Sequence, residues 1–286
     1  MAYAFRIVNV FTVGDDRFSG NPLCVFEDAR GLSDAQMQAL ARQMNLSETT
    51  FVLPASGDAD ARVRIFTPSY EMPFAGHPTL GTASVVGAAR GLSKLVFEMK
   101  AGRVPVAFNS TRWTLETAKP PRTRAVDASR AELARMVGLP DDAVSDPPLW
   151  VDTGTEQLVI PIRSPALVHA AKPVPELLAR WGYTPTREEA MAYLCAEDAA
   201  GWTVRFFFTS HGAVIEDPAT GSACANLGGW MLATGRALPV SVTVRQGDAV
   251  ERPSKLELEV DADKRIYVAG EVIELGHGTL RLDDER

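Results

Sequence analysis

Gly76-His77-Pro78-Thr79-Leu80-Gly81-Thr82-Ala83 and Glu216-Asp217-Pro218-Ala219-Thr220-Gly221-Ser222-Ala223 are two versions of one phrase, 140 residues apart in the chain. Laid over each other, they pair His77 with Asp217, Gly81 with Gly221 and Thr82 with Ser222. Each version predicts a helix start, because a polar residue precedes a proline whose missing N–H is harmless in a first turn. An apolar, aromatic stretch precedes each version, at residues 63–67 and 204–209. The chain is therefore predicted to contain two related halves.

The duplication also predicts where chemistry takes place. The first N–H groups of a helix have no partner inside the helix and attract anions. If the two halves face each other, two helix starts converge on one cleft, with His77 and Asp217 at its lip. Such a cleft is suited to a small anionic ligand.

Composition sets the class of protein. A chain of 286 residues is long enough for two domains of roughly 100 to 150 residues each. Its 46% hydrophobic and 23% charged residues are typical of a soluble globular protein. The net charge of -7 and the lack of any Lys/Arg cluster argue against nucleic acid as a partner.

The N-terminal residues, the lengths of the apolar runs and the cysteines argue against further classes of protein. Residues 1–10 alternate like a strand and lack the features of a signal peptide, and no apolar run reaches the ~18 residues of a membrane span. We therefore expect a cytoplasmic protein without a membrane partner. Cys24, Cys195 and Cys224 are odd in number and scattered, so neither a disulfide framework nor a metal site is predicted.

Periodicity and turn residues predict the elements of the first half. A helix is expected after Ser33, a good N-cap, with Met37, Leu40, Ala41 and Met44 on its inner face. A helix of small residues that starts at His77 is suited to burial inside a curved sheet. Strands are predicted over 1–12, 23–26, 48–54, 95–99, 104–108 and 113–115.

The second half follows a linker predicted at 118–123, where two prolines are adjacent. A strand at 152–161 is interpreted as an echo of the strand after Glu48. Helices are predicted over 129–137, 176–181, 187–194 and 218–235, and strands over 240–245, 256–260, 266–269 and 272–275. The domains are thus residues 1–118, with the final strand near 277–286 as an optional member, and residues 123–286.

Three acidic or basic side chains could carry chemistry, and each also has a structural interpretation. Glu48 is flanked by Leu46, Phe51 and Val52, so its carboxyl is expected to be partly desolvated and suited to proton transfer, although a solvated turn also fits. Asp217 fits a simple helix cap. His77 is a poorer cap and can exchange a proton near neutral pH.

The hydroxyl and glycine residues suggest contact with a ligand. No G-x-S-x-G pattern surrounds Ser222, so we assign it a contact with substrate and no nucleophilic role. The stretch 220–223 lacks the G-K-[ST] of a phosphate-binding loop, and no G-x-G-x-x-G follows a predicted strand. A nucleotide is therefore not expected.

Taken together, the longer phrases resemble the PhzF family, which is named for the phenazine biosynthesis isomerase. The match runs nearly end to end. It rests on Val8-Asn9-Val10-Phe11-Thr12, Gly20-Asn21-Pro22, Asn45-Leu46-Ser47-Glu48-Thr49-Thr50-Phe51, Arg64-Ile65-Phe66-Thr67-Pro68, residues 73–81, Thr153-Gly154, residues 216–223, Gln246-Gly247 and Arg252-Pro253-Ser254. One departure is Glu251, where the family usually has glycine.

The resemblance implies a diaminopimelate-epimerase-like α/β fold. Each of its two pseudo-symmetric halves is a curled, mainly antiparallel sheet around a central helix, and the active site lies between the halves. It also implies a homodimer, no metal or organic cofactor, and a small cyclic acid as substrate; in the phenazine pathway this is trans-2,3-dihydro-3-hydroxyanthranilate.

Carried over position by position, the resemblance makes Glu48 the general acid/base that moves a proton between carbons. His77 and Asp217 join it as catalytic residues that orient the substrate. The substrate-binding set is Gly76, Thr220, Gly221 and Ser222.

Two other functions remain open at the level of sequence. A racemase or epimerase on the same fold would need a thiol beside positions 76 and 217, where this chain has Gly76, His77 and Asp217. A binding protein without catalysis would keep the cleft as an anion receptor. The presence of Glu48 together with His77, Asp217 and Ser222 favours an isomerase over both.

Overall fold

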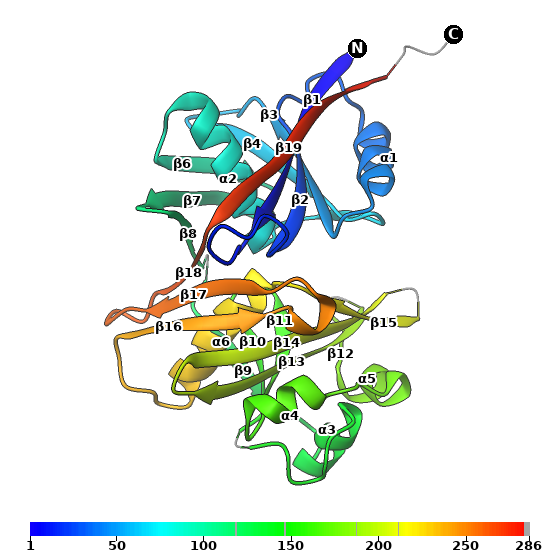
Figure 1. The fold of residues 1–286 in the computed structure, drawn as a ribbon, viewed down its shortest axis with the longest axis vertical. Coiled ribbons are helices and arrows are strands. Elements are labelled where there is room, and N and C mark those ends of the chain that lie inside the picture. Colours follow the sequence, from blue (N-terminus) through cyan, green and yellow to red (C-terminus); the bar gives the residue numbers. More distant parts are fainter. Residues whose placement is uncertain (118, 146, 187, 211, 283–286) are drawn as a thin grey trace. The chain divides into compact units, whose positions relative to one another are not determined.

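A computed structural model describes residues 1–117, 119–145, 147–186, 188–210 and 212–282. The chain forms two compact units. The first comprises Met1–Glu116 and the C-terminal segment from Ala269, and the second comprises Thr117–Val268. Figure 1 labels the elements of both units. Residue 118, the first of the expected linker, lies outside the described residues, and strand β9 begins inside that linker at Arg122.

The first unit is a mixed sheet with two helices. Strand β1 pairs with β2 and β19 in antiparallel fashion, as do β3 with β4 and β6 with β7, whereas β2–β3 and β4–β6 are parallel. Its elements are β1 (Ala2–Val10), β2 (Asn21–Phe26), α1 (Asp34–Met44), β3 (Glu48–Leu53), β4 (Ala61–Phe66), β5 (Glu71–Met72), α2 (Gly76–Arg90), β6 (Lys94–Met99), β7 (Gly102–Asn109), β8 (Arg112–Glu116) and β19 (Val272–Arg281).

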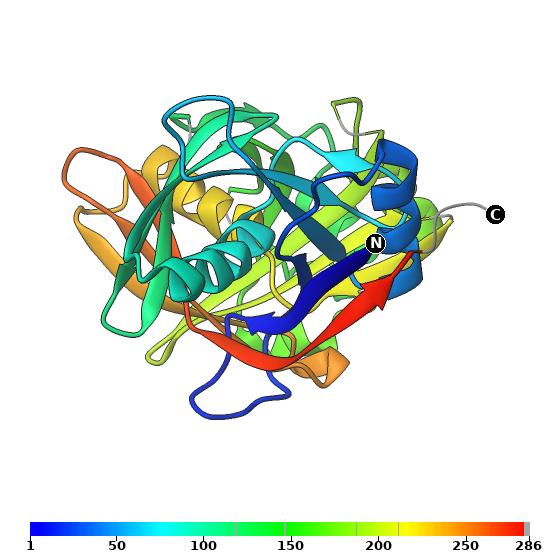
Figure 2. The ribbon, with the colours of Figure 1, turned by 90° about the horizontal axis from the view of Figure 1, so that it is seen from above.

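Helices α1 and α2 lie on opposite sides of β1 and β2, as Figures 1 and 2 both show. Ser33 caps α1 as predicted, in a capping box with Gln36. Helix α2 is buried along most of its length and packs against several strands. Gly81 permits this packing, because a Cβ there would lie 2.6 Å from Leu23 Cδ2 and 2.9 Å from Val10 Cγ2.

The second unit repeats this plan with more helices. Its buried helix is α6, and α3, α4 and α5 pack on a separate apolar cluster that includes Leu133, Leu158 and Leu178. Its elements are β9 (Arg122–Ala125), α3 (Arg130–Met136), β10 (Leu149–Asp152), β11 (Glu156–Pro161), α4 (Pro165–Ala170), α5 (Pro175–Trp181), β12 (Tyr183–Thr184), β13 (Glu189–Asp198), β14 (Gly201–Ser210), β15 (Ala213–Asp217), α6 (Gly221–Ala233), β16 (Val240–Gln246), a short 3-10 helix (Asp248–Val250), β17 (Ser254–Val260) and β18 (Ile266–Gly270).

The order of pairing is the same in both units. In the first, β3 and β4 are antiparallel, β5 folds back on β4, and α2 crosses to β6, which runs parallel to β4. In the second, β13, β14, β15, α6 and β16 repeat each of these relations. The expectation of two similar α/β halves is therefore confirmed.

Two predictions in the second half are wrong. The helix expected over 187–194 is strand β13, which begins at Glu189. Its glutamate, alanine, methionine and leucine residues favour a helix in isolation, but residues 190–196 are all buried and burial decides the outcome. The strand expected over 152–161 is present as β11 at Glu156–Pro161, after Asp152 ends β10, but its interpretation as the counterpart of the strand after Glu48 is wrong. Because β11 runs parallel to β13, it corresponds to β2 and does not echo β3.

Most other elements begin and end within a few residues of their predicted bounds. Ser129 caps α3 in a second capping box. Helix α4 was missed, and β19 is longer than the predicted 272–275 strand. No helix in the described part of the chain has the length and apolarity that a bilayer span requires.

Candidate active site

The two phrases begin their helices at different points. Helix α2 starts at Gly76 after Ala75, and α6 starts at Gly221 after Thr220. His77 and Ser222 are thus the second residues of their helices and correspond to each other. The predicted pairing of His77 with Asp217 is wrong by five residues, and neither residue is an N-cap. Asp217 is instead the last residue of β15.

The hairpins before the helices give the same alignment. Phe66 pairs with Glu71 in the first unit, and Phe207 pairs with Glu216 in the second. In both units the paired glutamate accepts two hydrogen bonds from an arginine of the preceding strand: Arg64 for Glu71, and Arg205 for Glu216. Met72 and Asp217 follow these glutamates, so they occupy equivalent positions.

Glu48 and His77 meet in the first unit. Glu48 begins β3, beside Leu23 of the parallel strand β2, and His77 projects from the first turn of α2. Glu48 Oε2 lies 3.5 Å from His77 Nε2, and the two side chains are only 14% and 5% exposed. The sequence prediction of a partly desolvated carboxyl at Glu48 agrees with this burial.

The imidazole of His77 is neutral. Burial lowers its pKa to about 3, although a hydrogen bond to the Pro22 carbonyl acts in the opposite direction. Nε2 makes no hydrogen bond with the described residues, so the N–H that donates to Pro22 is on Nδ1. Nε2 therefore presents a lone pair to the carboxyl group of Glu48.

This arrangement favours a shared proton. A neutral imidazole nitrogen and an ionised carboxylate oxygen are both acceptors, so they repel at short range, whereas a protonated carboxyl can donate to the nitrogen. Glu48 Oε2 thus lies beside a nitrogen atom that can accept a hydrogen bond. A group in such a site can take a proton from carbon and give it back.

In the second unit, Asp217 is hydrogen-bonded to Thr220 and Gln246. The Thr220 hydroxyl donates to Asp217 Oδ2 at 2.5 Å. Gln246 Nε2 donates to the Asp217 carbonyl at 2.8 Å and to Thr220 Oγ1 at 3.0 Å, and its Oε1 accepts from the Thr220 amide. The hydroxyl of Thr220, predicted to bind substrate, is therefore engaged with Asp217.

Ser222 is held by a second buried chain of contacts. Gln157 Nε2 donates to Ser222 Oγ at 3.0 Å, and Gln157 Oε1 accepts from Asn226 Nδ2 at 2.8 Å. Asn226 Oδ1 in turn accepts from the amide and the hydroxyl of Thr153. Because Gln157 and Asn226 are almost fully buried, the position of the Ser222 hydroxyl is fixed by the interior of the unit.

Sequence reasoning did not assign a role to Gln157, Asn226 or Gln246. Thr153 and Gln246 entered only as parts of the family resemblance. A shared Glu-x-Pro-x-x-Gly spacing, at residues 71–76 and 216–221, was the signal that could have given the correct alignment of the halves. With that alignment, one can identify the equivalent positions at which one unit has a polar side chain and the other an apolar one.

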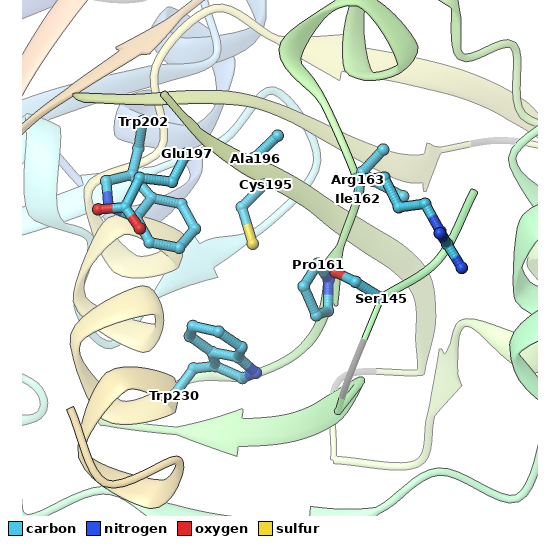
Figure 3. Close-up of a pocket in the computed structure, with 9 residues that line it drawn as sticks. All are labelled: Ser145, Pro161, Ile162, Arg163, Cys195, Ala196, Glu197, Trp202 and Trp230. Atoms are coloured by element: carbon cyan, nitrogen blue, oxygen red, sulfur yellow. The ribbon is translucent and has the colours of Figure 1, made fainter. Parts of the chain in front are cut away.

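None of the three cysteines is at the first two positions of α2 or α6. Cys224 is the fourth residue of α6, and burial raises the pKa values of the Cys224 and Cys195 thiols, with that of Cys24 raised to about 12. Cys195 lines a separate cavity of about 430 Å³, where its sulfur points toward Trp230 and Pro161 (Figure 3). None of the expected site residues lines this cavity.

No group of three or more His, Cys, Asp or Glu side chains within the described ranges is placed to hold a metal ion.

The comparison with protein families decides the identity of the chain. The model of the PhzC-PhzF family, phenazine biosynthesis-like proteins, matches residues 8–278. The chain belongs to this family. The PhzF resemblance found in the sequence is thus confirmed.

Relatives of this PhzC-PhzF protein are named isomerases. It is 38% identical over 280 residues to an uncharacterized isomerase of Pasteurella multocida, over 97% of this chain and 94% of the relative. It is 34% identical to a trans-2,3-dihydro-3-hydroxyanthranilate isomerase of Pseudomonas chlororaphis, over 92% of this chain and 94% of that one. The PhzC-PhzF protein is accordingly an enzyme of the isomerase type.

A solved structure confirms the fold. The PhzF-family protein of Bacillus anthracis superposes with a TM-score of 0.84 at 24% identity, covering 99% of this chain and all of the other. The expected diaminopimelate-epimerase-like fold is that of this PhzC-PhzF protein.

Proposed function

We propose that this protein is a cofactor-independent isomerase that moves a proton between two carbons of a small cyclic carboxylic acid, with Glu48 as the general acid/base. The observation that carries the proposal is the buried contact between Glu48 Oε2 and His77 Nε2, at 3.5 Å. Trans-2,3-dihydro-3-hydroxyanthranilate is the substrate to test first, because it is the one named for a relative at 34% identity.

The chemistry follows from the contacts. Glu48 removes a proton from one carbon, and the electron pair of the broken C–H bond delocalises toward the carboxylate of the substrate. The same carboxyl then returns the proton to another carbon of the conjugated system. His77 Nε2 accepts a hydrogen bond from Glu48 while the carboxyl is protonated, which steadies the acid between the two steps.

The helix starts supply the anion contacts in this proposal. Gly76 and His77 of α2, and Gly221 and Ser222 of α6, are first-turn residues whose amide N–H groups have no acceptor within the helix. Such groups stabilise negative charge on a carboxylate or on the intermediate. We propose Glu48, His77, Asp217 and Ser222 as residues that contact substrate.

Two features favour an isomerase over a two-base racemase. The second unit has Met191 where the first has Glu48. Thr49 and Ala192 are equivalent because they pair with equivalent phenylalanines, and Glu48 and Met191 are the residues directly before them. The thiol nearest the start of α6, that of Cys224, is buried and its pKa is raised, so its thiolate is disfavoured. A single proton carrier is what an isomerase needs.

The test is the variant Glu48→Gln, assayed with trans-2,3-dihydro-3-hydroxyanthranilate. Because one positioned acid/base contributes about 10² to 10⁴-fold to the rate, we expect kcat to fall by that factor while the substrate still binds. Glu259→Gln, an exposed carboxylate-to-amide change on β17, is the matched control and should keep the wild-type rate. Undiminished turnover in Glu48→Gln removes Glu48 from the mechanism.

A solvent-isotope measurement separates the other candidates. An isomerase or a racemase incorporates deuterium from D2O at a substrate carbon, whereas an anion receptor does not. Analysis of the product then distinguishes a shifted double bond from an inverted stereocentre.

Two wider expectations belong to the same proposal. A homodimer is tested by light scattering on the purified protein, and a monomer at working concentration contradicts it. A cytoplasmic location is tested by fractionation of the host cells.

A further inference from the structure

Asp217 stands in a polar environment that the first unit lacks. Its equivalent is Met72, and the equivalent of Thr220 is Ala75, the residue before α2. Gln246 is the last residue of β16, and Met99 is the last residue of β6. The two correspond because the residue before Met99 pairs with β4 at the position equivalent to the one at which the residue before Gln246 pairs with β14. Three polar residues that contact each other thus replace three apolar ones.

Each hydrogen bond among these three residues has one assignment of donor and acceptor that is consistent with the others. Gln246 Nε2 has two protons, and it gives one to the Asp217 carbonyl and one to Thr220 Oγ1. Thr220 Oγ1 accepts from Gln246, so its own proton is directed to Asp217 Oδ2. The Thr220 amide donates to Gln246 Oε1, which fixes the orientation of the Gln246 amide group.

The network is buried except at its end. Gln246 is 1% exposed and Thr220 is 8% exposed, while Asp217 is only partly buried. Gly247 holds the same loop from the other side, because a Cβ there would lie 2.6 Å from the Pro218 carbonyl oxygen and 2.1 Å from that of Arg252. The loop 217–220 is therefore fixed by contacts from β16 and the residues after it.

We propose that Gln246 and Thr220 are positioning residues that hold the Asp217 carboxylate in the orientation in which it contacts substrate. This inference rests on the proposed function for the role of Asp217, and goes beyond it in assigning Gln246 and in giving Thr220 a part other than direct substrate contact. Gln246 acts through Thr220. Because Gln246 donates to Thr220 Oγ1, the Thr220 hydroxyl donates its own proton to Asp217, and this hydrogen bond fixes one oxygen of the Asp217 carboxylate.

The main test uses Gln246→Met, which introduces the residue found at the equivalent position of the first unit, and Thr220→Val, which removes only the hydroxyl. With trans-2,3-dihydro-3-hydroxyanthranilate as probe, we expect kcat/KM to fall about 10- to 100-fold in each variant, with a raised KM. Simple loss of folded enzyme would lower kcat at an unchanged KM. Thr220→Ser keeps the hydroxyl and should stay within about threefold of wild type.

A double-mutant cycle with Asp217→Asn tests whether Gln246 acts through Asp217. In that background Gln246→Met should add less than about a twofold loss, because the group it positions has already been changed. Thr203→Val is the matched control: Thr203 is buried on β14 outside the network, and its change should leave kcat/KM at the wild-type value. A full additional loss from Gln246→Met in the Asp217→Asn background overturns the proposal.

Crystal structures of the wild type and of Gln246→Met give a readout that does not depend on turnover. We expect Asp217 Oδ2 on the Thr220 hydroxyl in the wild type and a displaced carboxylate in the variant. An unmoved carboxylate overturns the positioning role, whatever the activity. A wild type that leaves the probe unchanged counts against the proposed function at that substrate, and the two structures still decide the role of Gln246.

Discussion

The two units place different residue types at equivalent positions of the same plan. The first unit begins β3 with Glu48 and ends β5 with Met72, whereas the second has Met191 and Asp217 at those places. Helix α2 has Gly81 where α6 has Asn226, counted from the start of each helix. Each unit thus has a carboxylate where the other has a methionine.

This difference shows which positions of a duplicated fold are kept and which vary. The contacts that build the framework are kept in both copies, as the bidentate Arg64–Glu71 and Arg205–Glu216 pairs demonstrate. The residues that differ lie at strand ends and at helix starts, where a change of side chain alters chemistry without altering the pairing of strands.

The largest expected effect comes from giving the second unit the carboxylate of the first. Met191 is fully buried, so Met191→Glu would enclose an ionised carboxylate without a partner. We expect a loss of about 3 to 5 kcal/mol in the free energy of unfolding at pH 7, measured by urea denaturation. Met191→Leu is the volume-matched control and should cost less than about 1.5 kcal/mol. If Met191→Glu were as stable as wild type, this position would accept a charge. That result would contradict the contrast drawn between Glu48 and Met191.

The two arginine–glutamate pairs should differ in cost when the glutamate is neutralised. Arg205 also donates to the carbonyls of Val168, His169 and Ala171, and Glu216 is only 9% exposed, compared with 22% for Glu71. Arg64 retains a second partner in Asp34.

We therefore expect Glu216→Gln to cost about 3 kcal/mol of unfolding free energy and Glu71→Gln about 1 kcal/mol. Chemical denaturation of both variants checks the order, and the reverse order would contradict the comparison of the two pairs.

His77 should make the stability of the first unit depend on pH, in a way that Ser222 cannot. Its pKa is about 3 in the folded chain and about 6.5 when unfolded, so the unfolded state binds the extra proton between these values. Stability therefore falls as pH drops from about 6.5 toward 3, by up to about 1.4 kcal/mol per pH unit.

The variant His77→Asn keeps a donor for the Pro22 carbonyl and removes the titrating ring. The difference in unfolding free energy between wild type and variant, measured at pH 7, 5 and 4, should shrink as the pH falls. A constant difference would show that His77 does not titrate in this way.

The smallest effect is expected at Glu251, the departure from the family pattern. Its φ of 57° lies in the left-handed region that favours glycine, so the loop keeps a backbone shape suited to glycine. Glu251→Gly relieves this strain but makes the unfolded chain more flexible, and the net change should stay within about 1 kcal/mol. A melting curve checks this, and a large loss of stability would show that the Glu251 side chain has a structural role.

The bounds of most elements could be predicted because their signals are local, whereas the epimerase-like fold was implied by the family resemblance. Capping boxes at Ser33 and Ser129, prolines and alternating apolar residues determine where elements begin and end. The helix predicted over 187–194 failed because β13 is buried on both faces, and a strand with no polar face shows no alternation in its sequence.

The candidate site was predicted only in part, for a related reason. Small residues recur throughout both buried helices, so the phrases match in more than one register, and the match chosen from sequence paired His77 with Asp217. The hydrogen bonds of Gln157, Asn226 and Gln246 join residues that are 20 or more positions apart. Spacing along the chain carries no signal for such contacts.

A lone carboxyl at the start of β3 has a stereochemical consequence. If Glu48 is the one carrier that removes and returns the proton, as we propose, it acts from one side of the substrate ring, and we expect a suprafacial migration that gives the new centre a single configuration. The Glu48 side chain is only 14% exposed. A tritium atom taken from the starting carbon is therefore expected to exchange only in part with water, and the rest of that label should travel with the molecule to its new carbon.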